Sequence, residues 1–352
     1  GLIEVVSNNE PRIDFLNDSK GALLLEPSRS NLLTYSEDFT QWSKSSATTT
    51  ETSSAISTFG NYSLFETTAL GGSISLSASV SGVVTFSIYA KKGTAKAMRI
   101  RLDASVDANC WVNLENGTEV GTNTGQSLEI TDVNNGFYRI AFTANLTSLS
   151  IIRLYTTEAT TTADEVGNIY VYGAQLEQGS YATSYIPTQG SIGTRVAESC
   201  SQTVPDGIIG QTEGTVFLDS KMALQSINNH QLFSINNGGG SDRIRILTAT
   251  GNRLRFIYQL DGGTLFYNFY NPTDYGDLTN LKIAFTYKSG DIKVYINGVL
   301  ADSSTNTFTI AEKLIDIDIA TSTGGYNQML FNDIKLYNTA LTDQELQALT
   351  TI

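Results

Sequence analysis

The chain has 352 residues, enough for two domains, and only 16% of them are charged, against about 25% in an average soluble domain. With 22 Lys and Arg against 35 Asp and Glu, the formal net charge is −13, which removes the electrostatic attraction that binding to nucleic acid or anionic membranes requires. The chain has no apolar run of about 20 residues, the length needed to cross a membrane. It has a single histidine. We therefore expect no nucleic-acid partner, no membrane insertion and no His-cluster metal site.

The first 188 residues are predicted to form an extended segment and a β-domain. Residues 1–28 are predicted to be an extended N-terminal segment. Between residues 29 and 188, short β-branched and aromatic runs are separated by Gly, Asn, Asp or Thr. With no helical pattern between them, they favour an antiparallel jelly roll over βαβ units. The predicted strands are residues 84–90, 98–102, 138–144, 151–155 and 169–176.

Residues 189–205 are predicted to be an ordered connector, because they are small and polar and lie between two prolines without periodicity. Cys200 lies in this connector and Cys110 in the preceding domain. The two thiols can form a disulfide only if the fold brings them together, so the sequence leaves their pairing open.

Residues 206–352 are predicted to form a second β-sandwich. Residues 281–287 and 292–296 alternate as two strands of a hairpin, and Asn297-Gly298 is typical of the tight turn of a further hairpin. Residues 329–337 form a last strand, and the capping box that begins at Thr342 predicts one short helix. The predicted fold class is all-β, with two antiparallel β-sandwich (jelly-roll) domains and one short C-terminal helix.

Three runs in the second block carry a family resemblance: residues 294–298 (VYING), 331–338 (FNDIKLYN) and 341–346 (LTDQEL). They resemble the end of concanavalin A-like lectin/glucanase domains of the laminin-G-like type. Over residues 206–352, the resemblance implies a two-sheet jelly roll that often binds glycans and often holds calcium.

The first block resembles a narrower group. Its ends, residues 21–39 (GALLLEPSRSNLLTYSEDF) and 173–188 (GAQLEQGSYATSYIPT), resemble a module of phage tail-associated and marine bacterial surface proteins. Residues 31–188 resemble carbohydrate-binding jelly rolls of the family 4/9 type. That family carries Asp in its last strand near a structural calcium, whereas this chain has Tyr172-Gly173.

Catalytic motifs are incomplete. Glucanases of the resembled fold carry Glu-x-Asp-x-x-Glu, whereas here Asp316 and Asp318 share one strand face without the following Glu. The two carboxylates either face solvent, take part in catalysis or ligate a cation, and they are the candidate ligands of a structural calcium ion. A polysaccharide lyase would need Tyr326 or His230 as its base, but the arginine-rich strand of such enzymes is missing.

Aromatic side chains that stack on sugar rings are the first signal for glycan binding. In the run 265–270, alternation places Tyr267 and Tyr270 on opposite faces of a strand, so that one of them faces the core. We expect the other to form a platform with Tyr258 and Tyr275. Of the two tryptophans, Trp42 is the candidate ligand contact and Trp111 is expected in the core.

Arginines give the second signal. Four of them flank a turn-like segment, and in a hairpin they would share one face. Arginine forks match carboxylate and sulfate groups, which favours an anionic polysaccharide; an ordinary outward face with acidic neighbours is the alternative. The four are Arg243, Arg245, Arg253 and Arg255.

The sequence thus predicts a non-catalytic glycan-binding fragment of a phage tail or secreted surface protein. Its partner would be a polysaccharide or a cell-surface glycan, and its place the virion tail or the extracellular space. A homo-oligomer, such as a tail trimer, fits this setting. Two alternatives stay open: a polysaccharide-degrading lyase or glycosidase on a jelly roll, and a purely structural tail spacer.

Overall fold

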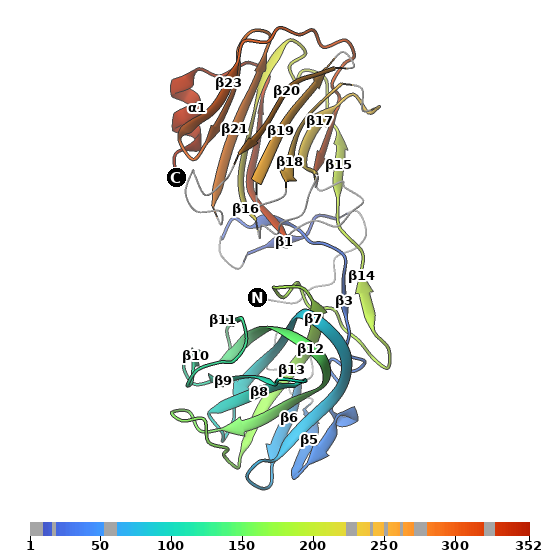
Figure 1. Cartoon of the computed structure of the whole chain (residues 1–352), viewed down its shortest axis with the longest axis vertical. Helices are drawn as coiled ribbons and strands as arrows, with labels where there is room; N and C mark the ends of the chain where they lie inside the picture. The colour runs from blue at the N-terminus through green and yellow to red at the C-terminus, as the bar shows by residue number, and fades with distance from the viewer. Residues whose placement is uncertain are drawn as a thin grey trace. The chain divides into compact units, whose positions relative to one another are not determined.

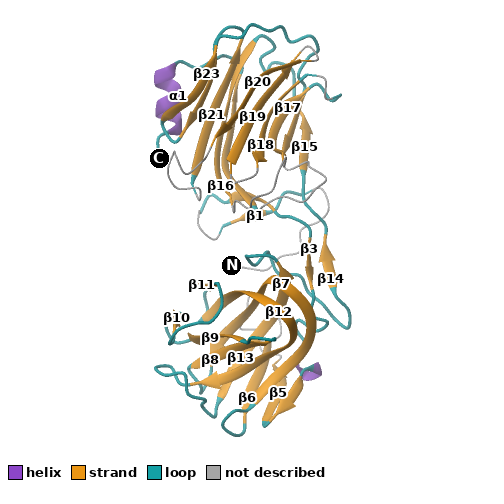
Figure 2. Ribbon diagram, viewed as in Figure 1, coloured by secondary structure: helices purple, strands orange, loops and turns teal. Residues whose placement is uncertain are grey.

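The computed structural model of the chain divides into two compact units, Arg29–Arg195 with Gly1–Val5, and Val6–Ser28 with Val196–Ile352 (Figure 1). It describes residues 10–15, 19–52, 62–222, 231–239, 242–249, 253–260, 263–270, 280–319 and 328–352. In these ranges both units consist of antiparallel strands, and the one α-helix is α1 (Asp343–Thr350), as Figure 2 shows. The predicted all-β class, with antiparallel sandwiches and a short C-terminal helix, is confirmed.

In the first unit, two long bent strands, β7 (Ser73–Lys92) and β12 (Phe137–Thr157), run through one ten-stranded sheet. Phe142 lies opposite Phe86 in one half of this pair, and Leu154 lies opposite Ile74 in the other. These side chains and those of the neighbouring strands form a single buried core, so the sheet curls around it. The other strands are β4 (Ser43–Ser45), β5 (Ala47–Thr52), β6 (Tyr62–Thr67), β8 (Ala97–Asp103), β9 (Ala108–Asn113), β10 (Thr118–Glu119), β11 (Ser127–Asp132) and β13 (Asn168–Gln178).

The bend in β12 corrects one prediction. The sequence predicts separate strands at residues 138–144 and 151–155, but both belong to β12. Register shifts relative to β7 surround Leu149, and Ser148 adopts a positive φ of 57°. Gly82, which lies opposite Leu146, has a φ of 97°. Bulges of this kind bend a strand without ending it, and the polar residues at the bend imitate a loop in the sequence.

Trp42 is also corrected, because it lies in the core of the first unit and cannot contact a ligand. Its side chain is 1% exposed, and its ring centroid lies 5.0 Å from that of Phe39. The indole Nε1 donates to the carbonyl oxygen of Tyr35 at 3.0 Å. Trp42 directly follows the short 3-10 helix η1 (Phe39–Gln41) and is its C-cap residue. A small separate sheet in this unit pairs β3 (Arg29–Asn31) with β14 (Gly193–Arg195).

The second unit is a sandwich of a seven-stranded and a six-stranded sheet around one apolar core. In order, the first sheet contains β1 (Ile13–Asp14), β2 (Ala22–Leu25), β25 (Met329–Tyr337), β16 (Glu213–Met222), β21 (Leu281–Lys288), β22 (Ile292–Ile296) and β23 (Val299–Ser304). The second contains β15 (Cys200–Thr203), β24 (Asp316–Ile319), β17 (Gln231–Asn236), β18 (Arg243–Ala249), β19 (Arg253–Leu260) and β20 (Gly263–Tyr270).

Part of the N-terminal segment completes the first of these sheets. Leu23 of β2 lies opposite Phe331 of β25, and Leu25 lies opposite Met329. Leu25 is 5% exposed and belongs to the core of the second unit. The segment therefore adds strands to a sheet whose other members follow about 200 residues later, a nonlocal pairing that local sequence patterns do not encode.

The C-terminal elements follow the sequence prediction closely. The turn between β22 and β23 has φ angles of 49° at Asn297 and 81° at Gly298, as a type I′ turn requires. Thr342 caps α1, and the Glu345 side chain accepts from the Thr342 backbone N–H at 2.8 Å. Leu346 of α1 is fully buried on the outer face of the seven-stranded sheet.

The two cysteines are free thiols in the structure. Cys110 is buried in the core of the first unit, where desolvation raises its pKa well above the usual value. Cys200 begins β15 of the second unit.

Candidate functional site

The outer face of the six-stranded sheet carries polar and basic side chains. Ile244 and Ile246 of β18 point into the core, so the intervening odd-numbered residues face outward. The register pairs Arg245 with Ile257 and Leu247 with Arg255, which places the four predicted arginines on this same outer face. We call it the arginine face; it contains Ser234, Asn236, Arg243, Arg245, Arg253, Arg255, Gln259, Asp316 and Asp318.

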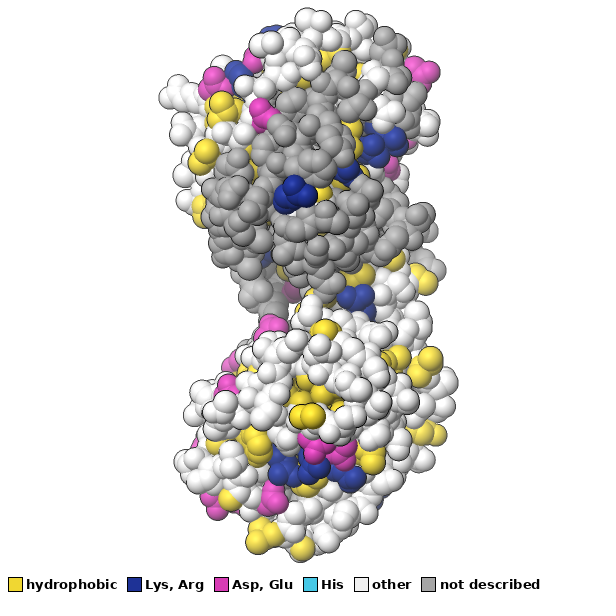
Figure 3. Space-filling view, viewed as in Figure 1, with side chains coloured by type: hydrophobic (Ala, Val, Ile, Leu, Met, Phe, Trp, Pro, Cys, Tyr) yellow, Lys and Arg dark blue, Asp and Glu magenta, His cyan; other side chains and the backbone are white. Residues whose placement is uncertain are grey.

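Arg245 is the exceptional charge of this face. Burial, together with the nearby charges of Arg243 and Arg255, lowers its pKa to about 10. Arg243 donates from Nε to Gln259 Oε1 at 3.0 Å, whereas the buried Nε of Arg245 has no hydrogen-bond partner within the described ranges. No carboxylate among the described residues forms an ion pair with Arg245. Basic side chains lie on this unit's side toward the viewer in Figure 3.

The two candidate calcium ligands lie on the same face, at its other end. Asp318 Oδ1 accepts from Ser201 Oγ at 2.6 Å, and Asp318 Oδ2 accepts from Asn236 Nδ2 at 2.7 Å. Asp316 Oδ1 accepts from Thr203 Oγ1 at 2.6 Å. Within the described ranges, no group of three or more His, Cys, Asp or Glu side chains could hold a metal ion. Calcium binding through these carboxylates stays a prediction.

The predicted tyrosine platform is partly wrong. Tyr258 is fully buried in the core of the second unit, and its hydroxyl donates to the carbonyl oxygen of Thr286 at 2.9 Å. It shares the inner face of β19 with Leu254 and Phe256, so a ligand cannot stack on it. The remaining calls fall outside the described residues: the side chains of Tyr267 and Tyr270, and the whole of Tyr275, His230 and Tyr326.

The first unit presents a second polar face, which the sequence prediction missed. Trp111 of β9 is half-buried and lies opposite Arg99 of β8, while Cys110 points into the core. The expectation of a core tryptophan here is therefore wrong. Strict alternation along 108–113 (ANCWVN) is the signal that could have shown it. We call this surface the tryptophan face; it contains Arg99, Arg101, Asp103, Asn109, Trp111, Arg153 and Tyr155.

Charges on the tryptophan face are compensated. Arg153 Nε lies 2.6 Å from Asp103 Oδ2, and Arg101 Nε lies 2.7 Å from Asp103 Oδ1. The Arg99 guanidinium stacks over the ring of Tyr155 with its Cζ 3.8 Å from the centroid. Figure 3 shows basic and acidic side chains together on this unit. The indole Nε1 of Trp111 is buried and has no hydrogen-bond partner in the described part of the structure, so the face combines an aromatic ring with a donor that remains unused.

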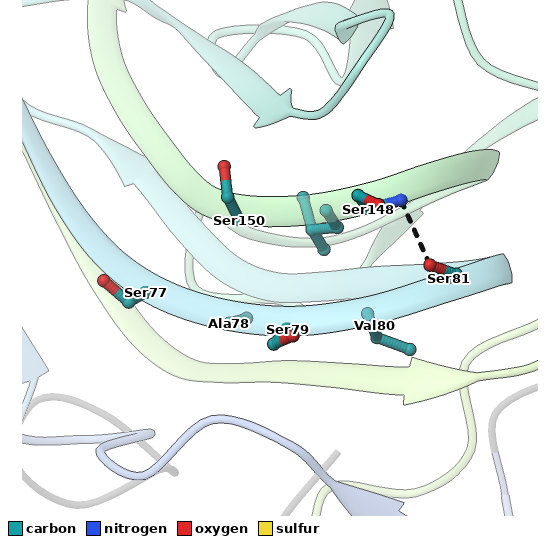
Figure 4. Close-up of a pocket in the computed structure, with 8 residues that line it drawn as sticks. Ser77, Ala78, Ser79, Val80, Ser81, Ser148 and Ser150 are labelled. Atoms are coloured by element: carbon teal, nitrogen blue, oxygen red, sulfur yellow. Dashed lines mark hydrogen bonds between the residues drawn. The ribbon is translucent and has the colours of Figure 1, made fainter.

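A serine-rich hollow of about 520 Å³ adjoins the tryptophan face at the bend of β7 and β12 (Figure 4). The Ser148 backbone N–H donates to Ser81 Oγ at 3.0 Å, which ties the two strands together. Ser150 Oγ donates to the carbonyl oxygen of Asp103 at 3.2 Å, which ties this part of β12 to the end of β8. Its lining residues are Ser77, Ala78, Ser79, Val80, Ser81, Ser148, Leu149 and Ser150.

A tyrosine cluster elsewhere in the first unit serves a structural purpose. Tyr172 and Tyr185 both donate their hydroxyls to Glu37 Oε1, at 3.1 and 3.0 Å. Burial, and then the adjacent Glu37 charge, raises the pKa of Tyr172. These hydroxyls are occupied by internal bonds, so we do not count the cluster as a binding site.

A comparison with known protein families found a match within the second unit. Residues 199–347 match the family model described as the Concanavalin A-like lectin/glucanases superfamily. The match agrees with the resemblance predicted for residues 206–352. No curated protein matches the chain. In the described residues, no helix is long and apolar enough to cross a membrane.

Similar solved structures include two botulinum neurotoxin chains. One comes from a study of botulinum neurotoxin type C and its interaction with two ganglioside molecules, with 15% identity and a TM-score of 0.36 over 43% of this chain and 39% of that chain. The other is the serotype D binding domain, with 14% identity and a TM-score of 0.37 over 43% of this chain and 40% of that one. This chain thus spans about two fifths of their length.

Proposed function

We propose that the chain is a non-catalytic glycan-binding protein, in which polar outer sheet faces bind the sugar. The observation that carries this proposal is the match of residues 199–347 to a superfamily of lectins and glucanases. In that unit the arginine face offers guanidinium, amide and hydroxyl groups, the kinds of group that pair with sugar hydroxyls.

The tryptophan face supports the same function in the first unit. An indole or phenol ring can stack on the C–H surface of a sugar while neighbouring polar groups bind its hydroxyls. Trp111 meets this requirement beside Asn109 and the paired charges of Arg101 and Asp103. The serine-rich hollow extends the polar surface by an area that a longer glycan could follow.

The proposal includes a location and the absence of catalysis. We place the chain in a phage tail or a secreted surface protein, on the resemblance of residues 21–39 and 173–188 to such modules. Asp316 and Asp318 already accept hydrogen bonds from hydroxyl and amide groups of the chain, and the Glu that follows such a pair in glucanases is missing from the sequence.

A glycan array probed with the whole chain tests binding. Hits should then be titrated by calorimetry against Trp111→Ala for the first unit and Arg245→Gln for the second. Lys335→Gln, which removes an exposed charge from the seven-stranded sheet, is the control and should bind normally. If no glycan binds at any concentration tested, the proposal is wrong.

Overnight incubation with each bound polysaccharide tests the non-catalytic part. We expect no new reducing ends and no ultraviolet absorbance from unsaturated uronates. Sustained turnover that Tyr326→Phe or His230→Ala abolishes, with the fold retained, would show that the chain is an enzyme.

A further inference from the structure

We infer that Arg243, Arg245 and Arg255 form an oxyanion-binding site on the arginine face of the second unit. This inference rests on the proposed function and names its ligand class: the carboxylate or sulfate group of an acidic sugar. An oxyanion of either kind offers the paired oxygens that a guanidinium fork binds.

The sheet register brings the three guanidinium groups together. Arg243 and Arg245 are two residues apart on β18, so their side chains leave the same face about 7 Å apart. Arg255 lies opposite Leu247 and is therefore the diagonal neighbour of Arg245, at about 7–8 Å. Arg245 is the middle member of a row of three cations.

Arg245, the middle member of the row, lacks among the described residues the partner that a structural role would need. Arg255 is 9% exposed and Arg245 is half-buried, so water screens their repulsion poorly. The buried Nε of Arg245 has no hydrogen-bond partner, and the described residues provide no carboxylate that pairs with it. A buried donor and an unpaired charge each destabilise the folded chain. A bound oxyanion would satisfy both.

The groups around Arg245 suit a sugar ring that carries the acid. Ser234 of β17 lies opposite Arg245, and Asn236 lies opposite Arg243, with Gln259 on the other side. Asp318, which lies opposite Ser234 on β24, accepts hydrogen bonds from Asn236, Ser201 and Ser234 and forms no ion pair with an arginine of the row among the described residues. Hydroxyl-binding groups thus flank the cations on both sides.

Inorganic sulfate tests the site without a glycan. Thermal melts in sodium sulfate and in sodium chloride at equal ionic strength should show a larger stabilisation by sulfate in the native chain than in Arg245→Gln. Lys335→Gln should match the native chain, because it removes one positive charge from the other sheet. Sulfate also stabilises proteins nonspecifically, so the difference between variants decides the outcome. An equal response of all three proteins would overturn the site.

Paired glycans test the ligand class. A sulfated polysaccharide and its desulfated form, and a uronate polymer and its carboxyl-reduced form, should differ in affinity for the native chain. Arg245→Gln should weaken binding of the acidic forms by about 10- to 100-fold and leave neutral forms unchanged. Arg245→Lys should restore part of the loss through charge without the fork.

The results separate the two proposals. Neutral and acidic forms bound equally by the native chain and by Arg245→Gln would overturn the acidic-sugar site and leave glycan binding standing. A sulfate effect that depends on Arg245, without binding of any glycan, would support the oxyanion site and overturn the proposed function.

Discussion

Replacing Arg12 with methionine should destabilise the second unit through the buried carboxylate of Glu26. Arg12 Nη2 lies 2.6 Å from Glu26 Oε2, and its Nε lies 2.5 Å from Glu198 Oε1. The Glu26 side chain is 0% exposed, and its backbone N–H donates to Glu198 Oε2 at 2.9 Å. Desolvation alone would lower the pKa of Arg12, but its hydrogen bonds and charge interactions with Glu198 and Glu26 raise it.

The magnitude follows from the burial of the three groups. Removing one partner of a buried ion pair costs about 3–5 kcal/mol, because the other charge stays buried. The side chains of Arg12 and Glu198 are 20% and 23% exposed, so water compensates part of the loss. We expect a loss of about 2–3 kcal/mol, or about 5–10 °C in melting temperature for a unit of this size. The double variant with Glu26→Gln should recover at least about 1 kcal/mol, because it removes the buried charge.

Urea unfolding with hydrogen exchange measured by mass spectrometry would locate the effect. Peptides of β2 and β25 should lose protection, while those of the first unit keep it. Lys313→Met is the matched control, since Lys313 pairs with Asp206 at 2.5 Å with side chains 51% and 86% exposed. It should cost less than about 0.5 kcal/mol. Equal losses in Arg12→Met and Lys313→Met would refute the reasoning, since burial would then not distinguish the two pairs.

Three further predictions concern the candidate sites. Tyr258→Phe should cost about 1 kcal/mol of unfolding free energy, measured in urea, by removing the hydrogen bond to Thr286, and it should leave glycan affinity unchanged. Trp42→Ala should cost about 3–5 kcal/mol, whereas Trp111→Ala should keep the melting temperature within a few degrees and abolish binding by the first unit. Calcium bound through Asp318 should raise the melting temperature relative to chelator by mass action, and identical calorimetric scans would exclude such an ion.

Local patterns predicted the second unit well where the structure depends on neighbouring residues. The hairpin signals correctly predicted that β18 pairs with β19 and that β21 pairs with β22. The capping box at Thr342 correctly predicted α1. The common face of the four arginines follows from the same alternation. The two-residue period of a strand and the turn-like sequence between β18 and β19 were enough to predict that these side chains share a face.

The sequence prediction was wrong for several aromatic residues, because it relied on residue type more than on the alternation of inward-facing and outward-facing positions along a strand. Tyr258 alternates with Leu254 and Phe256 on the inner face, and Trp111 alternates with Cys110, which lies in the core. Reading the period along each strand would have placed both correctly. Trp42 has no such signal, since it is the C-cap residue of a 3-10 helix and lies outside the strands.

Features that depend on distant residues had no local signal. The pairing of β2 with β25 joins positions about 300 residues apart. The ion pair of Asp103 with Arg153 joins β8 to β12. The absence of an acidic partner for Arg245 among the described residues is equally a property of the assembled sheet. The number of charges can be read from the sequence, but which charges are paired depends on the fold.

That difference in compensation separates the two faces chemically. The chain has 35 acidic residues for 22 basic ones, so an arginine without an acidic partner does not reflect a shortage of carboxylates. In the first unit, Asp103 and Asp107 together neutralise Arg101 and Arg153, which suits the proposed binding of the hydroxyls and C–H surface of a neutral sugar. In the second unit, the charge of Arg245 is left for a ligand to neutralise. Neutral sugars should therefore depend on Trp111 and acidic sugars on Arg245, so each variant should remove binding of one class of sugar and leave the other.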